Sequence, residues 1–256
     1  MRRILLRVAY DGTNYHGWQL QPNVETVENV LNRAICQLTG EEIQVIGASR
    51  TDAGVHALGN VAVFDTQSRI PAEKFSYALN QRLPDDIVVQ QSCEVAEDFH
   101  PRHCACRKTY EYDILNRTFP LPAYRNTAYF QYGKLDIEAM RRACREFTGE
   151  HDFAAFCAAG AQVETTVRTI YSLEIEERKL DAGADDGQSG RMITIRIKGN
   201  GFLYNMVRII AGTLLEVGKG HLDPEKIHEI IASGEREKAG PTAPAQGLRL
   251  VEIRFE

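Results

Sequence analysis

Residues 47–64 read GASRTDAGVHALGNVAVF, and the interpretation of the whole chain depends on this stretch. Its first half combines glycines with the polar run SRTD at 49–52. Glycine permits backbone conformations that other residues avoid, and Ser, Thr and Asp bond to nearby backbone groups. Apolar runs at 43–46 and 60–64 flank it. We therefore expect a shaped loop between two strands, where a scaffold often displays catalytic groups.

The composition of the chain is that of an ordinary globular protein. Its 256 residues are 43% hydrophobic and 25% charged, which predicts one large domain or two small ones. No apolar run approaches the roughly 20 residues that a membrane helix needs. The N-terminal MRRILLRVAY is too short and too charged for a signal peptide, so we expect a first strand and a cytoplasmic protein.

The charge distribution leaves a nucleic-acid partner open. The formal net charge of -5 argues weakly against one, because phosphate binding requires Lys and Arg. Arginines nevertheless cluster at 2–7, 102–107 and 141–145, while acidic residues concentrate at 181–186. A basic face on an acidic protein is compatible with this pattern.

The cysteines and histidines do not form a recognisable metal motif. The chain has six cysteines but no Cys-x-x-Cys, and in the cytoplasm we expect reduced thiols. His100, His103, Cys104 and Cys106 are close in sequence, yet their spacing fits no usual zinc template and Cys106 begins a predicted strand. We therefore expect no metal.

Hydrophobic periodicity divides the N-terminal half into strands and helices. Alternating or continuous apolar residues predict strands, and apolar residues three and four apart predict helices. A threonine cap and a glycine stop bound the first helix, and prolines bound the second. The predicted strands are 3–10, 43–46, 60–65 and 87–95, and the predicted helices are 26–40 and 71–83.

The C-terminal half repeats this order without an obvious sequence repeat. An acidic loop at 179–190 is expected to be mobile, and residues near 100–106 are expected to join the halves. The predicted strands are 108–115, 167–175, 193–197 and 248–255, and the predicted helices are 136–147, 203–217 and 224–233.

The order of these elements predicts an α+β fold. Each half reads as β-α-β-β-α-β, the ferredoxin-like arrangement. We expect two such halves, 1–104 and 105–256, joined into a continuous antiparallel sheet with helices on one face. An RNA-binding and active-site cleft is expected between the halves, because an open sheet face can bind single-stranded RNA bases.

Four stretches resemble the tRNA pseudouridine synthase A family. RTDAGVHA at 50–57 is similar to the family's catalytic loop, and RKTYEY at 107–112, GFLYNMVR at 201–208 and PAQGL at 244–248 are similar to its further motifs. The motifs occur in the family's order and the resemblance covers nearly the whole chain. Eight consecutive matching residues in the loop are far more specific than a glycine pattern alone.

The resemblance implies that Asp52 is the catalytic nucleophile. In pseudouridine synthesis the bond between uracil N1 and the ribose breaks, the bound base turns, and the ribose is rejoined to C5. A carboxylate suits this chemistry, because it can attack the sugar or the base, or take a proton from the ribose. The sequence leaves these three pathways open, and the reaction requires no cofactor.

A catalytic carboxylate in a buried site needs a nearby cation to stay charged. Arg50, two positions before Asp52, and Arg208, in an apolar helix, are both candidates from the residues alone. Most arginines are solvated, so a helix-surface position is the alternative for Arg208. The resemblance implies that Arg208 pairs with Asp52 and that Arg50 holds RNA, helping to extrude the target nucleotide.

Two apolar or aromatic residues complete the expected site. By resemblance, Tyr110 stacks on the target base and Leu248 packs beside it. From the residues alone, each is equally an ordinary core residue of a strand. His56 and Trp18 are expected to be structural, because a histidine beside a turn is more often structural than catalytic.

The resemblance implies a tRNA pseudouridine synthase, an isomerase that modifies uridines at positions 38 to 40 of the anticodon stem-loop. It also implies a homodimer with one tRNA spanning both subunits. A pseudouridine synthase for another RNA and a non-catalytic RNA-binding module remain alternatives. A hydrolase or nucleotide-binding enzyme is disfavoured, because neither Gly-x-Ser-x-Gly nor a phosphate loop is present.

Overall fold

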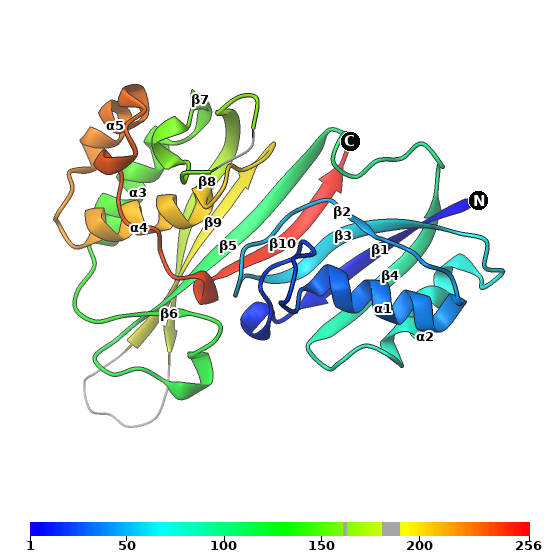
Figure 1. Ribbon diagram of the computed structural model, residues 1–256. Coiled ribbons are helices and arrows are strands. Elements are labelled where there is room, and N and C mark those ends of the chain that lie inside the picture. Colours follow the sequence, from blue (N-terminus) through cyan, green and yellow to red (C-terminus); the bar gives the residue numbers. More distant parts are fainter. Residues whose placement is uncertain (161–162, 181–189) are drawn as a thin grey trace. The chain divides into compact units, whose positions relative to one another are not determined.

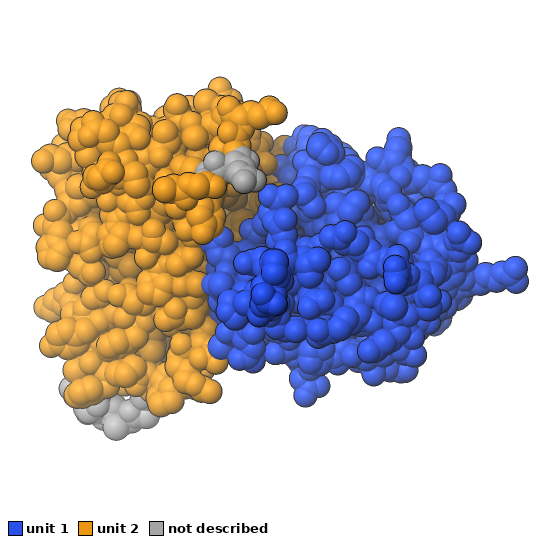
Figure 2. Space-filling model, viewed as in Figure 1, with its two compact units in different colours: residues 1–106, 249–256 blue, residues 107–248 orange. Residues whose placement is uncertain are grey.

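The computed structural model of the chain describes residues 1–160, 163–180 and 190–256. Most of the predicted acidic loop at 179–190 lies outside the described residues. The chain divides into two compact units (Figure 2), unit 1 at residues 1–106 and 249–256 and unit 2 at residues 107–248. Compared with the predicted halves, the division falls two residues later, and the final strand groups with unit 1.

Unit 1 is a sheet covered by two helices that contact each other (Figure 1). Strand β1 is central and pairs antiparallel with β3 and β4; β3 also pairs antiparallel with β2 and parallel with β10. Alternate β1 side chains from Ile4 to Tyr10 are buried, as a half-buried strand requires. The elements are β1 (Arg2–Tyr10), α1 (Val27–Thr39), β2 (Ile46–Gly47), β3 (His56–Thr66), α2 (Phe75–Asn80), β4 (Ile87–Val95) and β10 (Leu248–Phe255).

Helix α1 has the ends that the sequence predicts. The Thr26 hydroxyl accepts a hydrogen bond from the Asn29 N–H, and Gly40 ends the helix in the left-handed conformation. Its apolar residues from Val27 to Ile35 are buried. The edge-to-face pair of Phe64 and Phe75, with centroids 5.4 Å apart, joins β3 to α2 in the same core.

Unit 2 contains strands in the order β5-β9-β8-β7, with antiparallel pairs throughout this path. Helix α3 contacts α4, α5 and strand β8. A short strand, β6, pairs parallel with β5. The elements are β5 (Cys106–Asn116), β6 (Tyr129–Gln131), α3 (Ile137–Glu146), β7 (Gly149–Asp152), β8 (Val167–Leu180), β9 (Gly190–Gly199), α4 (Met206–Gly218) and α5 (Ile227–Ser233).

The predicted α+β class is confirmed by mostly antiparallel strand pairing together with separate helices. The finer description, two ferredoxin-like halves joined in one continuous sheet with a cleft between them, stays a prediction. Strands β6 and β7 were not predicted, because runs of three and four residues are too short to show a period.

Three predicted elements are shorter in the structure than the sequence pattern indicates. The Val45 N–H donates to the Asn32 side chain, and the predicted strand at 43–46 is reduced to Ile46–Gly47. Helix α2 ends at Asn80, whose amide exchanges two hydrogen bonds with the Val89 backbone. Helix α4 begins only at Met206, because Asn205 has φ of 59°.

Candidate active site

The predicted catalytic loop is present in unit 1 between β2 and β3. We call residues 48–55 the Asp52 loop. Its backbone is fastened to the segment that follows β1: the Trp18 N–H donates to the Thr51 carbonyl at 3.0 Å, and the Gly54 N–H donates to the Tyr15 carbonyl at 3.2 Å. The Val55 N–H closes a turn on the Asp52 carbonyl. Asp52 itself is half-buried, while Arg50 is exposed.

A buried polar network lies under the loop. The Tyr10 and Thr51 hydroxyls are 2.7 Å apart, and the Asn60 amide donates to both the Tyr10 hydroxyl and the Ser49 carbonyl. Asn60 is fully buried, so these bonds satisfy polar groups that water does not reach. The loop therefore has a fixed shape set from below by β1 and β3.

Two glycines let the first turn of the chain approach the loop closely. A Cβ on Gly12 would lie 2.1 Å from the Val55 carbonyl oxygen, and one on Gly17 would lie 2.6 Å from the Thr51 carbonyl oxygen. Gly17 also has φ of 87°, which favours glycine. Sequence reasoning did not assign Gly12, Gly17 or Asn60 to the site; the two glycines around a Tyr-Asp-Gly turn were the available signal.

His56 begins β3 directly after the loop, and its expected structural role stays a prediction. Its side chain is buried, and Nδ1 lies 3.0 Å from the Gly12 N–H nitrogen and 3.1 Å from an Asp11 carboxylate oxygen. Burial acts to raise the pKa of Asp11, but hydrogen bonds from Thr13 and the nearby His56 outweigh it, and the net pKa lies below its usual value. The contacts tie the end of the loop to the turn after β1.

Arg208 is fixed within unit 2. It lies half-buried on α4, where Nε donates to the Ala243 carbonyl at 2.8 Å and one terminal nitrogen donates to the Asn205 side chain at 2.7 Å. Arg208 is therefore not in open solvent, and its pairing with Asp52 stays a prediction. Its positive charge also acts on Tyr112, whose pKa burial raises despite that charge.

Tyr110 and Leu248 are both buried, and both belong to unit 2. The Tyr110 ring meets Phe202 edge-to-face with centroids 5.3 Å apart. Two residues along β5, the Tyr112 hydroxyl donates to the Pro244 carbonyl at 2.8 Å, and a Cβ on Gly247 would lie 2.7 Å from the Tyr112 ring. The segment that leads into Leu248 thus packs on the β5 face that carries these tyrosines. Asp52 and Arg50 belong to unit 1 and the other predicted site residues to unit 2, so their pairing stays a prediction.

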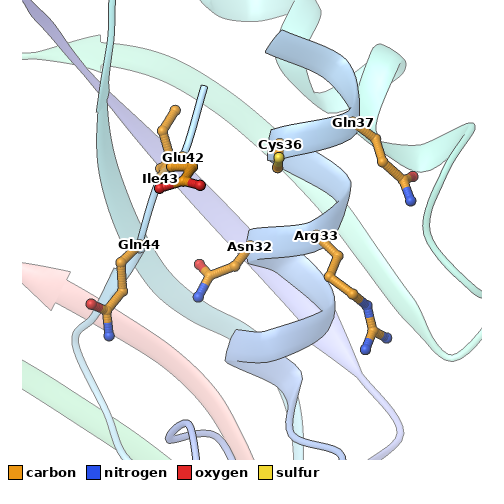
Figure 3. Close-up of a pocket in the computed structure, with 7 residues that line it drawn as sticks. All are labelled: Asn32, Arg33, Cys36, Gln37, Glu42, Ile43 and Gln44. Atoms are coloured by element: carbon orange, nitrogen blue, oxygen red, sulfur yellow. The ribbon is translucent and has the colours of Figure 1, made fainter. Parts of the chain in front are cut away.

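Two cavities flank helix α1 in unit 1. One, of about 360 Å³, adjoins the start of the Asp52 loop and is lined by Arg50 and Arg102 among others. The other, of about 530 Å³, lies between α1 and the segment before β2 (Figure 3). Gln44 lines both. The lining of the second cavity is Asn32, Arg33, Cys36, Gln37, Glu42, Ile43 and Gln44.

The residues weighed as metal ligands in the sequence lie around His100, where no metal is expected. The His100 and His103 rings lie 4.1 Å apart, and burial and neighbouring cations lower the pKa of His100. Among the described residues, no group of three or more His, Cys, Asp or Glu side chains is arranged to hold a metal ion. Nor does any helix in the described ranges have the length and apolar character to cross a membrane.

Comparison with known proteins identifies the family. The family described as tRNA pseudouridine synthase matches residues 7–103 and 143–256. The tRNA pseudouridine synthases A of Acetivibrio thermocellus and Ruminiclostridium cellulolyticum are each 51% identical over 255 residues, covering 100% of both chains. The tRNA pseudouridine synthase A 2 of Clostridium perfringens is 48% identical over the same length.

These matches define an enzyme of the isomerase class. The chain belongs to the tRNA pseudouridine synthase family. The resemblance inferred from the four sequence motifs is confirmed.

Proposed function

We propose that the protein isomerises uridine to pseudouridine in the anticodon stem-loop of tRNA, at positions 38 to 40, with Asp52 as the nucleophile. One structural observation carries this proposal: Asp52 is half-buried on a loop whose backbone is fastened by buried hydrogen bonds. A carboxylate held in this way is preorganised for attack rather than free to rotate into solvent. Family membership supplies the reaction class and the RNA substrate.

The proposed reaction leaves the composition of the nucleotide unchanged. The bond between N1 and C1′ breaks, the uracil turns, and a bond forms between C5 and C1′. The C5 hydrogen leaves as a proton, and N1 gains one. Asp52 either forms and later breaks a bond to the sugar or the base, or takes a proton from the ribose and returns it. It is regenerated in each of these three pathways, and the proposal leaves the choice among them open.

The proposal assigns Arg208 as the ion-pair partner of Asp52. A half-buried carboxylate tends towards the neutral form unless a cation lies near it. Arg208 suits this role, because its bonds to Ala243 and Asn205 fix the guanidinium while leaving its charge intact. Arg50 is assigned to the RNA, which agrees with its exposure on the loop.

Tyr110 and Leu248 are assigned to the target base. An aromatic face holds uracil by stacking and still permits the base to turn. The edge-to-face contact with Phe202 restricts the Tyr110 ring and so defines that face. The target uridine must leave its stack to reach Asp52, which costs a few kcal/mol and less in a loop than in a helix. The proposed enzyme is a cytoplasmic homodimer, with one tRNA contacting both subunits.

Release of tritium from tRNA labelled at uridine C5 tests the proposal, because forming the new bond expels that hydrogen. The wild type is compared with Asp52→Asn, which keeps the side-chain shape and removes the charge. Asp85→Asn is the matched control, since Asp85 is an exposed carboxylate of the same unit outside the loop. We expect release by wild type and control, no detectable release by Asp52→Asn, and unchanged tRNA binding by all three.

Mapping the modified positions tests the substrate assignment. If pseudouridine appears in tRNA outside positions 38 to 40, the anticodon assignment is wrong while the chemistry stands. If the wild type binds tRNA and releases no tritium, the non-catalytic RNA-binding alternative replaces the proposal.

A further inference from the structure

The cavity beside the Asp52 loop combines two arginines with a buried carboxylate. It lies wholly within unit 1, and its volume of about 360 Å³ is in the range of small-molecule sites, about 300 to 1,000 Å³. Arg50, Arg102 and Glu28 are its charged residues, so the lining carries a net charge of two minus one, or +1. The remaining lining residues are Trp18, Gln19, Gln44, Val45, Ile46 and Gly47.

Arg102 is anchored to the root of the Asp52 loop. Its Nε donates to the Gly47 carbonyl at 3.0 Å, across 55 positions of sequence. This bond fixes the Nε edge of the guanidinium, and the N–H groups of its two terminal nitrogens are left for another acceptor. Gly47 immediately precedes the loop, so this contact places a cation next to the site.

The two arginines lie close enough to repel each other. Burial and the charge of Arg50 lower the pKa of Arg102, and Glu28 raises it. Within the part of the chain that the structure describes, neither Arg50 nor Arg102 forms an ion pair with a carboxylate. A pair of like charges held together without a counter-ion is an arrangement that an anion stabilises.

Glu28 does not fill that role, because its carboxylate faces other donors. One oxygen accepts the Leu20 N–H at 3.0 Å and the other accepts the Gln44 side-chain amide at 3.3 Å. These bonds hold Glu28 on the α1 side of the cavity. The arginine side of the cavity remains positively charged.

We propose that Arg102 and Arg50 form a phosphate subsite that binds one phosphodiester of the RNA strand carrying the target uridine. The proposal rests on the proposed function for the identity of that strand. The net charge of the lining balances the single negative charge of a phosphodiester, and arginine forks match its oxygens. Binding there holds the strand at the root of the Asp52 loop.

The salt dependence of RNA binding tests the subsite. Wild type, Arg102→Gln and Arg69→Gln are titrated with a tRNA anticodon hairpin across a range of salt concentrations. Arg69 is the control, because it is exposed and follows the end of β3 remote from the Asp52 loop. A plot of log affinity against log salt concentration has a negative slope, and each lost phosphate contact makes that slope less steep by about 0.7 to 0.9. We expect that decrease and about tenfold weaker binding for Arg102→Gln alone.

Arg102→Lys separates the phosphate role from support of Gly47. Lysine restores the charge but not the Nε geometry. Recovery of the wild-type salt slope by Arg102→Lys supports the phosphate subsite. If Arg102→Gln has the same slope as Arg69→Gln, or Arg102→Lys recovers nothing, Arg102 supports the loop only and the proposal is overturned.

Single methylphosphonate substitutions along the hairpin test the subsite even if Arg102→Gln fails to fold. The wild type should lose affinity at one neutralised phosphate near the target uridine, and Arg102→Lys should show a smaller loss there. A scan with no sensitive position near the target overturns the proposal. Because binding needs no turnover, absent tritium release by wild type refutes the proposed function separately from the subsite.

Discussion

The Asp52 loop in unit 1 lies on a buried side-chain hydrogen-bond network, and the segment 240–248 in unit 2 combines hydrogen bonds to its carbonyl groups with closer backbone packing. Below the loop, Tyr10, Thr51 and Asn60 form a buried hydrogen-bond network. The segment instead lies against α4 and β5 with almost no space between: a Cβ on Gly212 would lie 1.8 Å from the Pro241 carbonyl oxygen. Two further glycines, Gly240 and Gly247, make similar approaches.

Buried polar networks and close backbone contacts are sensitive to different substitutions. A buried network fails when one polar atom is removed, because its partners are left unsatisfied. A close backbone contact fails when one carbon is added, because the surrounding atoms must move. Both kinds of contact occur in both regions, since Gly12 approaches the loop closely and Tyr112 donates to Pro244 in the segment. The features that differ are the side-chain network next to Asp52 and the tight packing on Gly212.

The largest effect is expected from disturbing the close packing of the segment 240–248 on α4. Gly212→Ala places a methyl group against the Pro241 carbonyl, and it should lower the free energy of unfolding by about 3 kcal/mol and reduce kcat. Urea unfolding and tritium release measure both. Gly201→Ala is the control, since its added carbon would meet only Arg168 at 3.7 Å. Equal stability of the two variants would contradict the steric account.

The next largest effect is expected from removing the Tyr10 hydroxyl from the hydrogen-bond network next to the Asp52 loop. Tyr10→Phe leaves Thr51 and Asn60 without their shared partner, and it should lower the free energy of unfolding by about 2 kcal/mol. A double-mutant cycle combines Tyr10→Phe with Asn60→Ala. The double variant should lose less free energy of unfolding than the sum of the two single losses, because both substitutions remove the same contact. Simple additivity in urea unfolding would show that the network is not coupled.

Tyr112→Phe measures how much a single hydrogen bond contributes to holding the segment 240–248 in unit 2. It removes one hydrogen bond to the Pro244 carbonyl, whereas the glycine contacts of the segment persist. We expect a loss of about 1 kcal/mol in the free energy of unfolding, smaller than that for Tyr10→Phe. Urea unfolding of both variants in parallel measures the difference. A larger loss for Tyr112→Phe would mean that hydrogen bonding also dominates in unit 2.

The smallest expected effect is a pH dependence at the end of the Asp52 loop. The pKa of Asp11 is lowered in the folded protein, so its contribution is present above the unfolded pKa of about 3.9 and is lost as the pH falls through the lower folded value. Asp11→Asn should therefore lower the free energy of unfolding by about 0.5 kcal/mol at pH 7. Urea unfolding at lower pH should show that difference shrinking below about pH 4. Asp85→Asn should show no such trend.

Local patterns were sufficient to predict the α+β class and most elements. The periodic residues of α1 and the alternation in β1 encode which face is buried, and caps such as Thr26 act within one turn. At the strand predicted for 43–46, a distant side chain competes for the backbone, because the Val45 N–H donates to Asn32. Such competition has no signal in the sequence near the affected element.

The sequence by itself determined the family, the Asp52 loop and the residues assigned to its chemistry, because a contiguous motif such as 50–57 is specific without knowledge of the fold. Only the tertiary structure decided what holds that loop. The Asn60 amide meets Tyr10 across 50 positions, and Arg102 meets Gly47 across 55. A hydrogen bond depends on atoms within about 3 Å, and the pairing of distant strands, not sequence separation, brings those atoms together.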